Sequence, residues 1–206
     1  MNLANRLTVS RIGLTFVMTF FLTFPSIPFG KTMALIVFIA ASLTDYWDGR
    51  IARQANHVTS FGKFMDPLAD KILVCAAFVS FAAIQQVVPA WVVITIISRD
   101  FVVTGLRLVA AGAGTVIPAG AIGKHKTGWQ IGVIIVINAG LAIETDLLPR
   151  LLPHLPPAPW VAAFPKLFAD YFRYVTYALS SLAAILTVVS GVVYMWKNRH
   201  LYINDM

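Results

Sequence analysis

Six long apolar stretches, separated by short polar or proline-containing breaks, dominate this sequence of 206 residues. We expect spans at Leu7–Phe24, Thr32–Ala52, Phe61–Ala83, Pro89–Ala111, Thr127–Ala142 and Tyr171–Trp196. A helix needs about 20 mostly apolar residues to cross a bilayer, and within the bilayer only helices and closed barrels satisfy their backbone hydrogen bonds. The sequence therefore predicts an all-α, polytopic membrane protein with six transmembrane helices, forming a single domain over residues 1–206.

The composition agrees with this prediction. Hydrophobic residues make up 58% of the chain and charged residues only 12%, whereas soluble domains average about 45–50% and about 25%. So few charges cannot cover a globular surface in water. The net charge of +7 would also suit a nucleic-acid binder, but no soluble basic region is present to bind one. We therefore expect no nucleic-acid partner, and we assign the charge to the cytoplasmic face of a membrane protein.

Basic residues alternate between the two sides of the predicted membrane. One side has Arg6, Arg11, Arg50, Arg53, Lys63, Lys124, Lys126, Lys197 and Arg199, and the other has Lys31, Arg150 and Lys166. Positive charge favours the cytoplasmic side, so we expect both termini there. The connection at about residues 144–170 then lies on the opposite side. Its six prolines argue against a long regular helix and allow a short surface helix at Trp160–Phe168.

Four aspartates lie where a membrane protein should have few carboxylates. Asp45 and Asp48 are three residues apart near the end of the second span, and Asp66 and Asp70 are four apart in the third. Each pair therefore shares one helix face, and the short connection between the spans predicts a helical hairpin on which the two faces meet. Converging carboxylates repel one another unless cations are present, and oxygen ligands suit Mg²⁺ or Mn²⁺. Singly, each aspartate could equally form an ion pair with a nearby Arg or Lys.

Small residues are interleaved with these aspartates. Gly49 and Ala52 reduce the bulk of the second span, and Gly62 does so at the start of the third. They let helices approach closely and leave room for a flat ligand against the backbone. Arg53, one turn beyond Gly49, is placed to contact phosphate oxygens.

Residues 45–70 match a complete family signature, D-x2-D-G-x2-A-R-x8-G-x3-D-x3-D, with no departure at a fixed position. In this the chain resembles the CDP-alcohol phosphotransferases. The resemblance implies a six-helix membrane domain, usually a homodimer, in which a CDP-linked donor transfers its phosphatidyl group to an alcohol and releases CMP. It also implies a bacterial cytoplasmic (inner) membrane location, with the active site at the cytoplasmic side.

Site roles follow from the same resemblance. Asp45, Asp48 and Asp66 would bind the metal, expected as two ions of Mg²⁺ or Mn²⁺, and Asp70 would act as the general base and also contact the second ion. The donor site would contain Asp45, Gly49, Ala52, Arg53, Thr59 and Gly62.

The flanking residues resemble the phosphatidylglycerophosphate synthase branch of the family. The resemblance lies in Asn5-Arg6-Leu7-Thr8, Ser98-Arg99-Asp100-Phe101, Gly105-Leu106-Arg107 and Gly123-Lys124-His125-Lys126-Thr127. Two departures are an alanine at position 4, where proline is usual, and Asp100, where glutamate is common. That branch uses CDP-diacylglycerol as donor and glycerol 3-phosphate as acceptor.

Four cations form the predicted site for the acceptor phosphate. Arg99 and Arg107 are eight residues apart, about two turns, so they share a helix face, and Lys124 and Lys126 precede the fifth span. Alternatively, Arg99 pairs with an aspartate, and the lysines only anchor the cytoplasmic side. Neighbouring residues on a helix do not face each other, which argues against an Arg99–Asp100 pair.

Two other functions stay open. The acceptor could be serine, inositol phosphate, or phosphatidylglycerol in cardiolipin formation, although acceptors without a phosphate would not need this cationic group. A divalent-cation transporter would also need a membrane aspartate site, but near the midplane and with repeated, broken helices, for which the sequence has no sign.

Overall fold

The computed structural model describes residues 3–55, 60–112 and 121–199, with side chains at 8–44, 68–69, 71–108, 110 and 126–199. Six long helices account for most of these residues: α1 (Leu3–Thr23), α2 (Gly30–Ala55), α3 (Ser60–Ala83), α4 (Ala90–Gly112), α5 (Ala121–Ala142) and α7 (Pro159–Lys197). The described ranges contain no strand, which confirms the all-α prediction.

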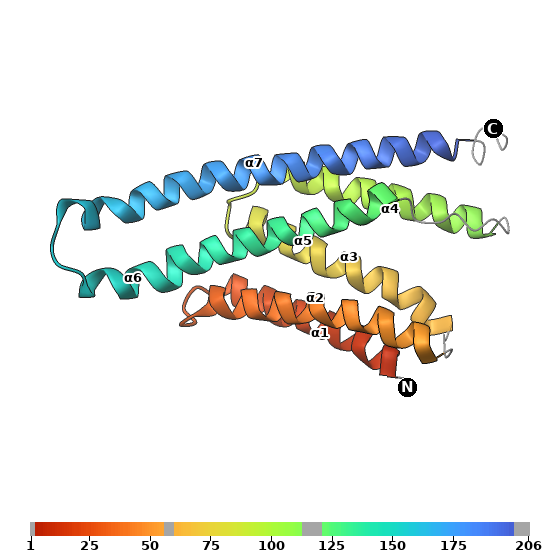
Figure 1. The fold of residues 1–206 in the computed structure, drawn as a ribbon, viewed down its shortest axis with the longest axis horizontal. Coiled ribbons are helices and arrows are strands. Elements are labelled where there is room, and N and C mark those ends of the chain that lie inside the picture. Colours follow the sequence, from red (N-terminus) through yellow and green to blue (C-terminus); the bar gives the residue numbers. More distant parts are fainter. Residues whose placement is uncertain (1–2, 56–59, 113–120, 200–206) are drawn as a thin grey trace.

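The long helices form an elongated bundle, in which α1 and α2 lie along one side, α4 and α7 along the other, and α3 and α5 between them (Figure 1). α1 begins and α7 ends at the same end of the bundle. We call it the signature end, because α2 ends there and α3 begins there. The opposite end, which we call the far end, holds the short elements η1 (Ile143–Leu147), α6 (Leu148–Leu151) and η2 (Leu152–His154).

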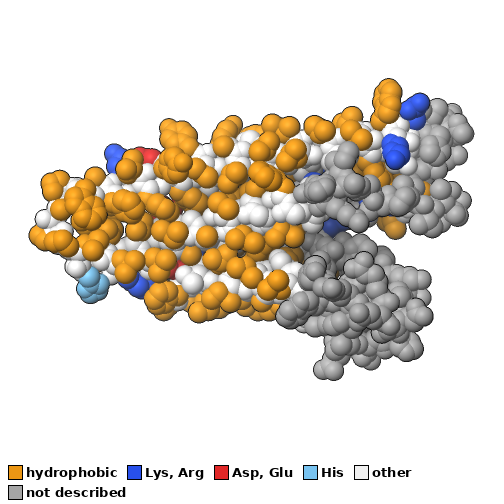
Figure 2. All heavy atoms as spheres, in the orientation of Figure 1, with side chains coloured by type: hydrophobic (Ala, Val, Ile, Leu, Met, Phe, Trp, Pro, Cys, Tyr) orange, Lys and Arg blue, Asp and Glu red, His pale blue; other side chains and the backbone are white. Residues whose placement is uncertain are grey.

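Helix spacing explains how α1 packs. Thr8, Arg11, Thr15, Met18 and Leu22 recur every three or four residues and are all buried, so they form one face. That face packs against α2 and α3. On the outside, hydrophobic side chains cover much of the described part of the face seen in Figure 2, as expected of a surface in contact with lipid.

Two helical segments of the described chain, Lys126–His154 and Pro159–Lys197, are long and apolar enough to cross a bilayer. Three shorter apolar segments lie at Thr8–Thr23, Gly30–Thr44 and Lys71–Ala83. The segments thus agree with a membrane protein, while the six-span topology stays a prediction.

The predicted hairpin of the second and third spans is wrong as a side-by-side pair. α2 and α3 make little direct contact along their described lengths, whereas α1 packs extensively on both and α2 also packs on α5. A short connection holds only the adjoining ends of two helices together. Other helices cover the remaining faces, so α2 and α3 diverge from the signature end (Figure 1).

The proline-rich connection is more helical than expected. Instead of a separate surface helix at residues 160–168, α7 runs without a break from Pro159 to Lys197, with Pro165 inside it. Proline is tolerated in the first turn of a helix, and Pro149, Pro153 and Pro159 each lie in the first turn of a helical element. Pro165 lies inside α7 and removes a helical hydrogen bond there, which a helix of 39 residues can lose without ending.

Polar contacts join the elements at the far end. The carboxylate of Asp146 in η1 accepts hydrogen bonds from the backbone N–H and the hydroxyl of Thr32, each 2.8 Å long, at the start of α2. The carbonyl of Leu22, in the last turn of α1, accepts 2.6 Å bonds from Lys31 and Gln85. These bonds satisfy backbone groups that helix ends leave unpaired and fix α1, α2 and η1 relative to one another.

The first prediction concerns Gly140 of α5, which packs against the ring of Phe172 on α7. A Cβ atom at Gly140 would lie 1.9 Å from the ring of Phe172, whereas one at Gly132 on the same helix would meet nothing within 4 Å. Gly140→Ala should therefore destabilise the protein by about 1–3 kcal/mol, as overpacking does, and lower its unfolding temperature in detergent. Gly132→Ala is the matched control and should be neutral or stabilising, because alanine favours helices. Equal unfolding temperatures for the two variants would contradict this packing.

Candidate active site

The signature residues occupy two helix ends that meet at one end of the bundle. Asp45 and Asp48 lie in the second half of α2, and Asp66 and Asp70 in the first half of α3. The predicted donor residues Gly49, Ala52 and Arg53 also lie on α2, and Gly62 lies on α3, while Thr59 is outside the described residues. The side chains of all these residues lie outside the description, so their convergence stays a prediction.

The donor chemistry at these helix ends fits a hard divalent cation. Four residues, 56–59, separate the end of α2 from the start of α3, so both helices bring their carboxylate residues to the signature end. Oxygen ligands of this kind suit Mg²⁺ and Mn²⁺. Among the side chains that the structure describes, no group of three or more His, Cys, Asp or Glu residues could hold a metal, and the metal site expected at the signature stays a prediction.

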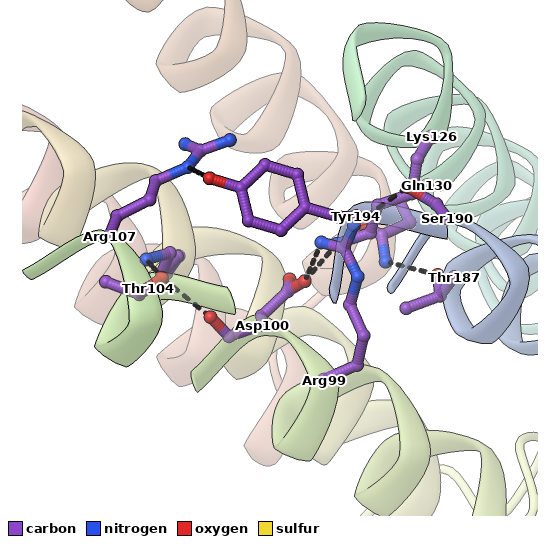
Figure 3. Close-up of polar contacts among 10 residues, drawn as sticks. Arg99, Asp100, Thr104, Arg107, Lys126, Gln130, Thr187, Ser190 and Tyr194 are labelled. Carbon is purple, nitrogen blue, oxygen red and sulfur yellow. Dashed lines mark hydrogen bonds and ion pairs between the residues drawn. The ribbon is translucent and has the colours of Figure 1, made fainter. Parts of the chain in front are cut away.

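A second polar cluster joins α4, α5 and α7, and its centre is the carboxylate of Asp100 (Figure 3). Lys126 of α5 forms an ion pair with Oδ1 of Asp100, and a guanidinium nitrogen of Arg99 lies 3.1 Å from the same oxygen. Lys126 is 6% exposed and the side chain of Arg99 is 14% exposed. Two cations share one carboxylate here, which leaves a local formal charge of +1.

The Arg99–Asp100 pair corrects our expectation that neighbours on a helix would not meet. The carboxylate of Asp100 points towards Lys126, and the long side chain of Arg99 reaches into the same region to donate a 2.8 Å hydrogen bond to the hydroxyl of Ser190 on α7. The guanidinium group of Arg99 and the carboxylate of Asp100 thus meet away from the helix surface. At that distance from the backbone, the separation of the neighbouring Cα positions no longer keeps them apart. Gly191 makes this possible, because a Cβ atom there would lie 2.8 Å from Cγ of Arg99.

Arg107 also contacts α7. Its Nε donates a 3.1 Å hydrogen bond to the hydroxyl of Tyr194, and its guanidinium carbon lies 5.2 Å from the centre of the Tyr194 ring. Figure 3 shows the phenol side chain extending from α7 to the head of Arg107. Both contacts orient a guanidinium group that is otherwise exposed to its surroundings.

A hydrogen-bonded chain connects this cluster to the signature helix. Lys71, the residue after Asp70 on α3, donates to the hydroxyl of Thr104 on α4, and that hydroxyl donates a 2.6 Å bond to the backbone carbonyl of Asp100. The cationic cluster and the aspartate-bearing helix are therefore adjacent.

The structure brings three of the four predicted acceptor cations, Arg99, Arg107 and Lys126, to α7 or to the Asp100 carboxylate beside it. The side chain of Lys124 lies outside the description. Ser190, Gly191 and Tyr194 were missed at the sequence level. For Ser190 and Gly191 the signal was a stripe of hydroxyl and small residues along an apolar helix, buried in the structure and made up of Thr176, Ser180, Ala183, Ala184, Thr187, Ser190 and Gly191. Tyr194 lies outside this stripe.

An apolar cavity of about 550 Å³ opens between α5 and α7 beside the cluster. Lys126 lines it together with Gly132, Val136, Leu179 and Val189, among other residues. A cavity with this lining suits hydrocarbon, and Lys126, which is part of its described lining, also belongs to the ion-pair cluster.

Comparison with known proteins agrees with this geometry. Residues 1–196 match the CDP-alcohol phosphatidyltransferase family. The CDP-diacylglycerol–glycerol-3-phosphate 3-phosphatidyltransferase of Bacillus subtilis (strain 168) is 43% identical over 208 residues, covering 96% of this chain and 95% of that protein. The protein of the same name from Rickettsia bellii (strain RML369-C) is 33% identical, covering 82% and 92%.

A probable phosphatidylglycerophosphate synthase of Mycobacterium tuberculosis (strain ATCC 25618 / H37Rv) is 36% identical over 144 residues, which cover 68% of each chain. The family match spans the signature, the cationic cluster and most of α7. The resemblance seen in the sequence is thus confirmed over nearly the whole chain, which belongs to the CDP-alcohol phosphatidyltransferase family.

Proposed function

We propose that this protein transfers the phosphatidyl group of CDP-diacylglycerol to sn-glycerol 3-phosphate, giving phosphatidylglycerophosphate and CMP. The observation that carries the proposal is the complete signature over residues 45–70, in a chain similar over 96% of its length to a protein named for this reaction. The apolar cavity between α5 and α7 supports a lipid substrate.

The reaction is a displacement at phosphorus. A hydroxyl oxygen of glycerol 3-phosphate forms a bond to the phosphorus beside the diacylglycerol, and the bond from that phosphorus to the CMP oxygen breaks, so CMP leaves with the electron pair. Asp70 accepts the hydroxyl proton as general base. Asp45, Asp48 and Asp66 would hold one or two ions of Mg²⁺ or Mn²⁺, with Asp70 beside the second. When bound, the metal stabilises negative charge on the diphosphate oxygens.

The donor and acceptor occupy different parts of the signature end. Asp45, Gly49, Ala52, Arg53, Thr59 and Gly62 form the proposed CDP site. Arg99, Arg107, Lys124 and Lys126 form the proposed site for the acceptor phosphate. The surplus of positive charge around Asp100 supports this, because Arg99 and Lys126 share a single carboxylate and can still attract an anion.

Membrane topology and assembly complete the proposal. Six helices would span the bacterial cytoplasmic (inner) membrane, with both termini and the active site on the cytoplasmic side, and two copies would form a homodimer. The start of α1 and the end of α7 both lie at the signature end (Figure 1), which supports an even number of spans.

An acceptor panel tests the overall reaction. Purified protein with CDP-diacylglycerol and Mg²⁺ should release CMP when glycerol 3-phosphate is added, and much less with serine, which has no phosphate for the cationic cluster to bind. Inositol phosphate and phosphatidylglycerol, which do carry phosphate, complete the panel. Released CMP and labelled lipid product are measured, and chelation of the metal is the control. Consumption of serine or phosphatidylglycerol but not of glycerol 3-phosphate would disprove the proposed acceptor.

A second prediction concerns the general base. Asp70→Asn should lower kcat by at least about 10²-fold, since general-base catalysis contributes about 10²–10⁴-fold, while binding of labelled CDP-diacylglycerol stays close to that of the unchanged protein. Asp170→Asn, at an exposed position of α7 near the far end, is the matched control. If Asp70→Asn abolished donor binding, the residue would be a donor ligand and not the base.

A third prediction concerns the acceptor phosphate. Arg107→Ala should raise KM for glycerol 3-phosphate about 10- to 100-fold, the equivalent of a hydrogen bond to a charged group of about 1.5–3 kcal/mol, with little change in KM for the lipid donor. Arg173→Ala removes an exposed arginine of α7 and should change neither value. An equal rise in both KM values would show that Arg107 does not serve the acceptor.

A further inference from the structure

Two hydroxyl groups of α7 contact the two arginines of α4. Ser190 accepts a 2.8 Å hydrogen bond from Arg99, and Tyr194 accepts a 3.1 Å bond from Arg107. Ser190 and Tyr194 are four residues apart and therefore share a helix face, while Arg99 and Arg107 are about two turns apart. α4 and α7 run in the same direction, because both end at the signature end (Figure 1), so the two contacts follow the same order along both helices.

We propose that Ser190 and Tyr194 are positioning residues that orient Arg99 and Arg107 for the phosphate of the acceptor. The inference rests on the proposed function, in which those arginines bind glycerol 3-phosphate. It adds α7, which lies outside the signature, to the elements that determine acceptor affinity.

The hydrogen bond to Tyr194 leaves the end of the Arg107 guanidinium group available for a ligand. A guanidinium group can bind phosphate end-on, through parallel N–H groups of its two terminal nitrogens. The hydroxyl of Tyr194 bonds to Nε, and no other hydrogen bond of the Arg107 side chain occurs within the described residues. The two terminal nitrogens therefore remain for a ligand, while the ring of Tyr194, 5.2 Å from the guanidinium carbon, limits its movement.

Arg99 is held from two helices at once. One terminal nitrogen contacts Asp100 of α4 at 3.1 Å, and the other contacts Ser190 of α7. Its Nε is buried, without a hydrogen-bond partner in the described part of the chain, and faces Gly191, where a Cβ atom would lie 3.2 Å away. Without the hydroxyl of Ser190, only the carboxylate of Asp100 would orient this guanidinium group. Orientation matters because a ligand binds more weakly to a side chain that it must first immobilise.

Tyr194→Phe and Ser190→Ala test the proposal in the full-length enzyme. The first removes only the hydroxyl and keeps the ring. Each variant should raise KM for glycerol 3-phosphate on the order of tenfold, since a bond to a charged group is lost, and leave KM for CDP-diacylglycerol within about twofold. Tyr174→Phe, at a tyrosine that is 77% exposed, and Ser181→Ala, whose hydroxyl has no described partner, are matched controls that should behave like the unchanged protein.

A double-mutant cycle separates positioning from general damage to α7. In an Arg107→Ala background, Tyr194→Phe should have no further effect on KM for glycerol 3-phosphate, because residues in contact are not additive. Ser190→Thr keeps a hydroxyl and should restore the affinity that Ser190→Ala loses. If Ser190→Ala fails to fold, Tyr194→Phe and the cycle decide the question.

Three outcomes overturn the inference. They are equal changes in both KM values, additive effects in the cycle, and a Tyr194→Phe variant indistinguishable from the unchanged enzyme. Failure of the proposed function is recognised separately, because the unchanged protein would then not use glycerol 3-phosphate at all.

Discussion

The signature end of this bundle depends on the interactions of the Asp100 carboxylate. This carboxylate lies on α4, forms an ion pair with Lys126 of α5, and holds Arg99, which in turn contacts Ser190 of α7. One acidic group thereby joins α4 to α5 and, through Arg99, to α7. A buried cation without a counter-ion is strongly destabilising, so removing this carboxylate would leave both Lys126 and Arg99 uncompensated. The same arrangement contains more positive than negative charge, which makes it both a structural joint and a place where an anion is attracted.

The far end of the bundle uses polar groups differently. Asp146 accepts two hydrogen bonds from Thr32, and Lys31 and Gln85 both donate to the carbonyl of Leu22. Apart from the hydroxyl of Thr32, the groups that pair with these side chains are backbone groups at helix ends, and the contacts satisfy needs that any helix end has. At the signature end, by contrast, cations are paired with hydroxyl groups and a shared carboxylate, and the terminal nitrogens of Arg107 remain available within the described residues. Buried polar groups thus stabilise both ends, and the cations proposed to bind the acceptor phosphate, Arg99, Arg107 and Lys126, lie at the signature end.

Much of this arrangement could be predicted from the sequence, and the exceptions have a common cause. The apolar stretches predicted where the long helices lie, because a span needs about 20 consecutive apolar residues and such a run is visible in the sequence itself. Helical spacing also placed Arg99 and Arg107 on one face. Spacing does not say which helix that face meets, so the contacts with Ser190 and Tyr194 could not be foreseen. The Arg99–Asp100 pair and the packing of α1 between α2 and α3 escaped prediction for the same reason, since both depend on a third helix. A helix that continues through Pro165 was also not predicted. The hydrogen bond that proline removes argued against it, but the packing of a 39-residue helix outweighs that loss. The aspartate side chains lie outside the described residues, so their convergence still depends on the signature alone.

The connection through Lys71 and Thr104 gives the cationic cluster a fixed relation to the proposed base. Lys71 follows Asp70 directly, and its bond to Thr104, which itself bonds to the carbonyl of Asp100, joins α3 to α4 at the level of the cluster. A displacement reaction needs the acceptor hydroxyl close to the base and in line with the leaving group, and a misplacement of about 1 Å can lower the rate about 10²-fold. If the acceptor is held by its phosphate through α4 and α7, its hydroxyl can meet Asp70 only while α3 and α4 keep their register. The hydrogen-bonded chain from Lys71 to Asp100 would preserve that register, and it lies outside both proposed binding sites.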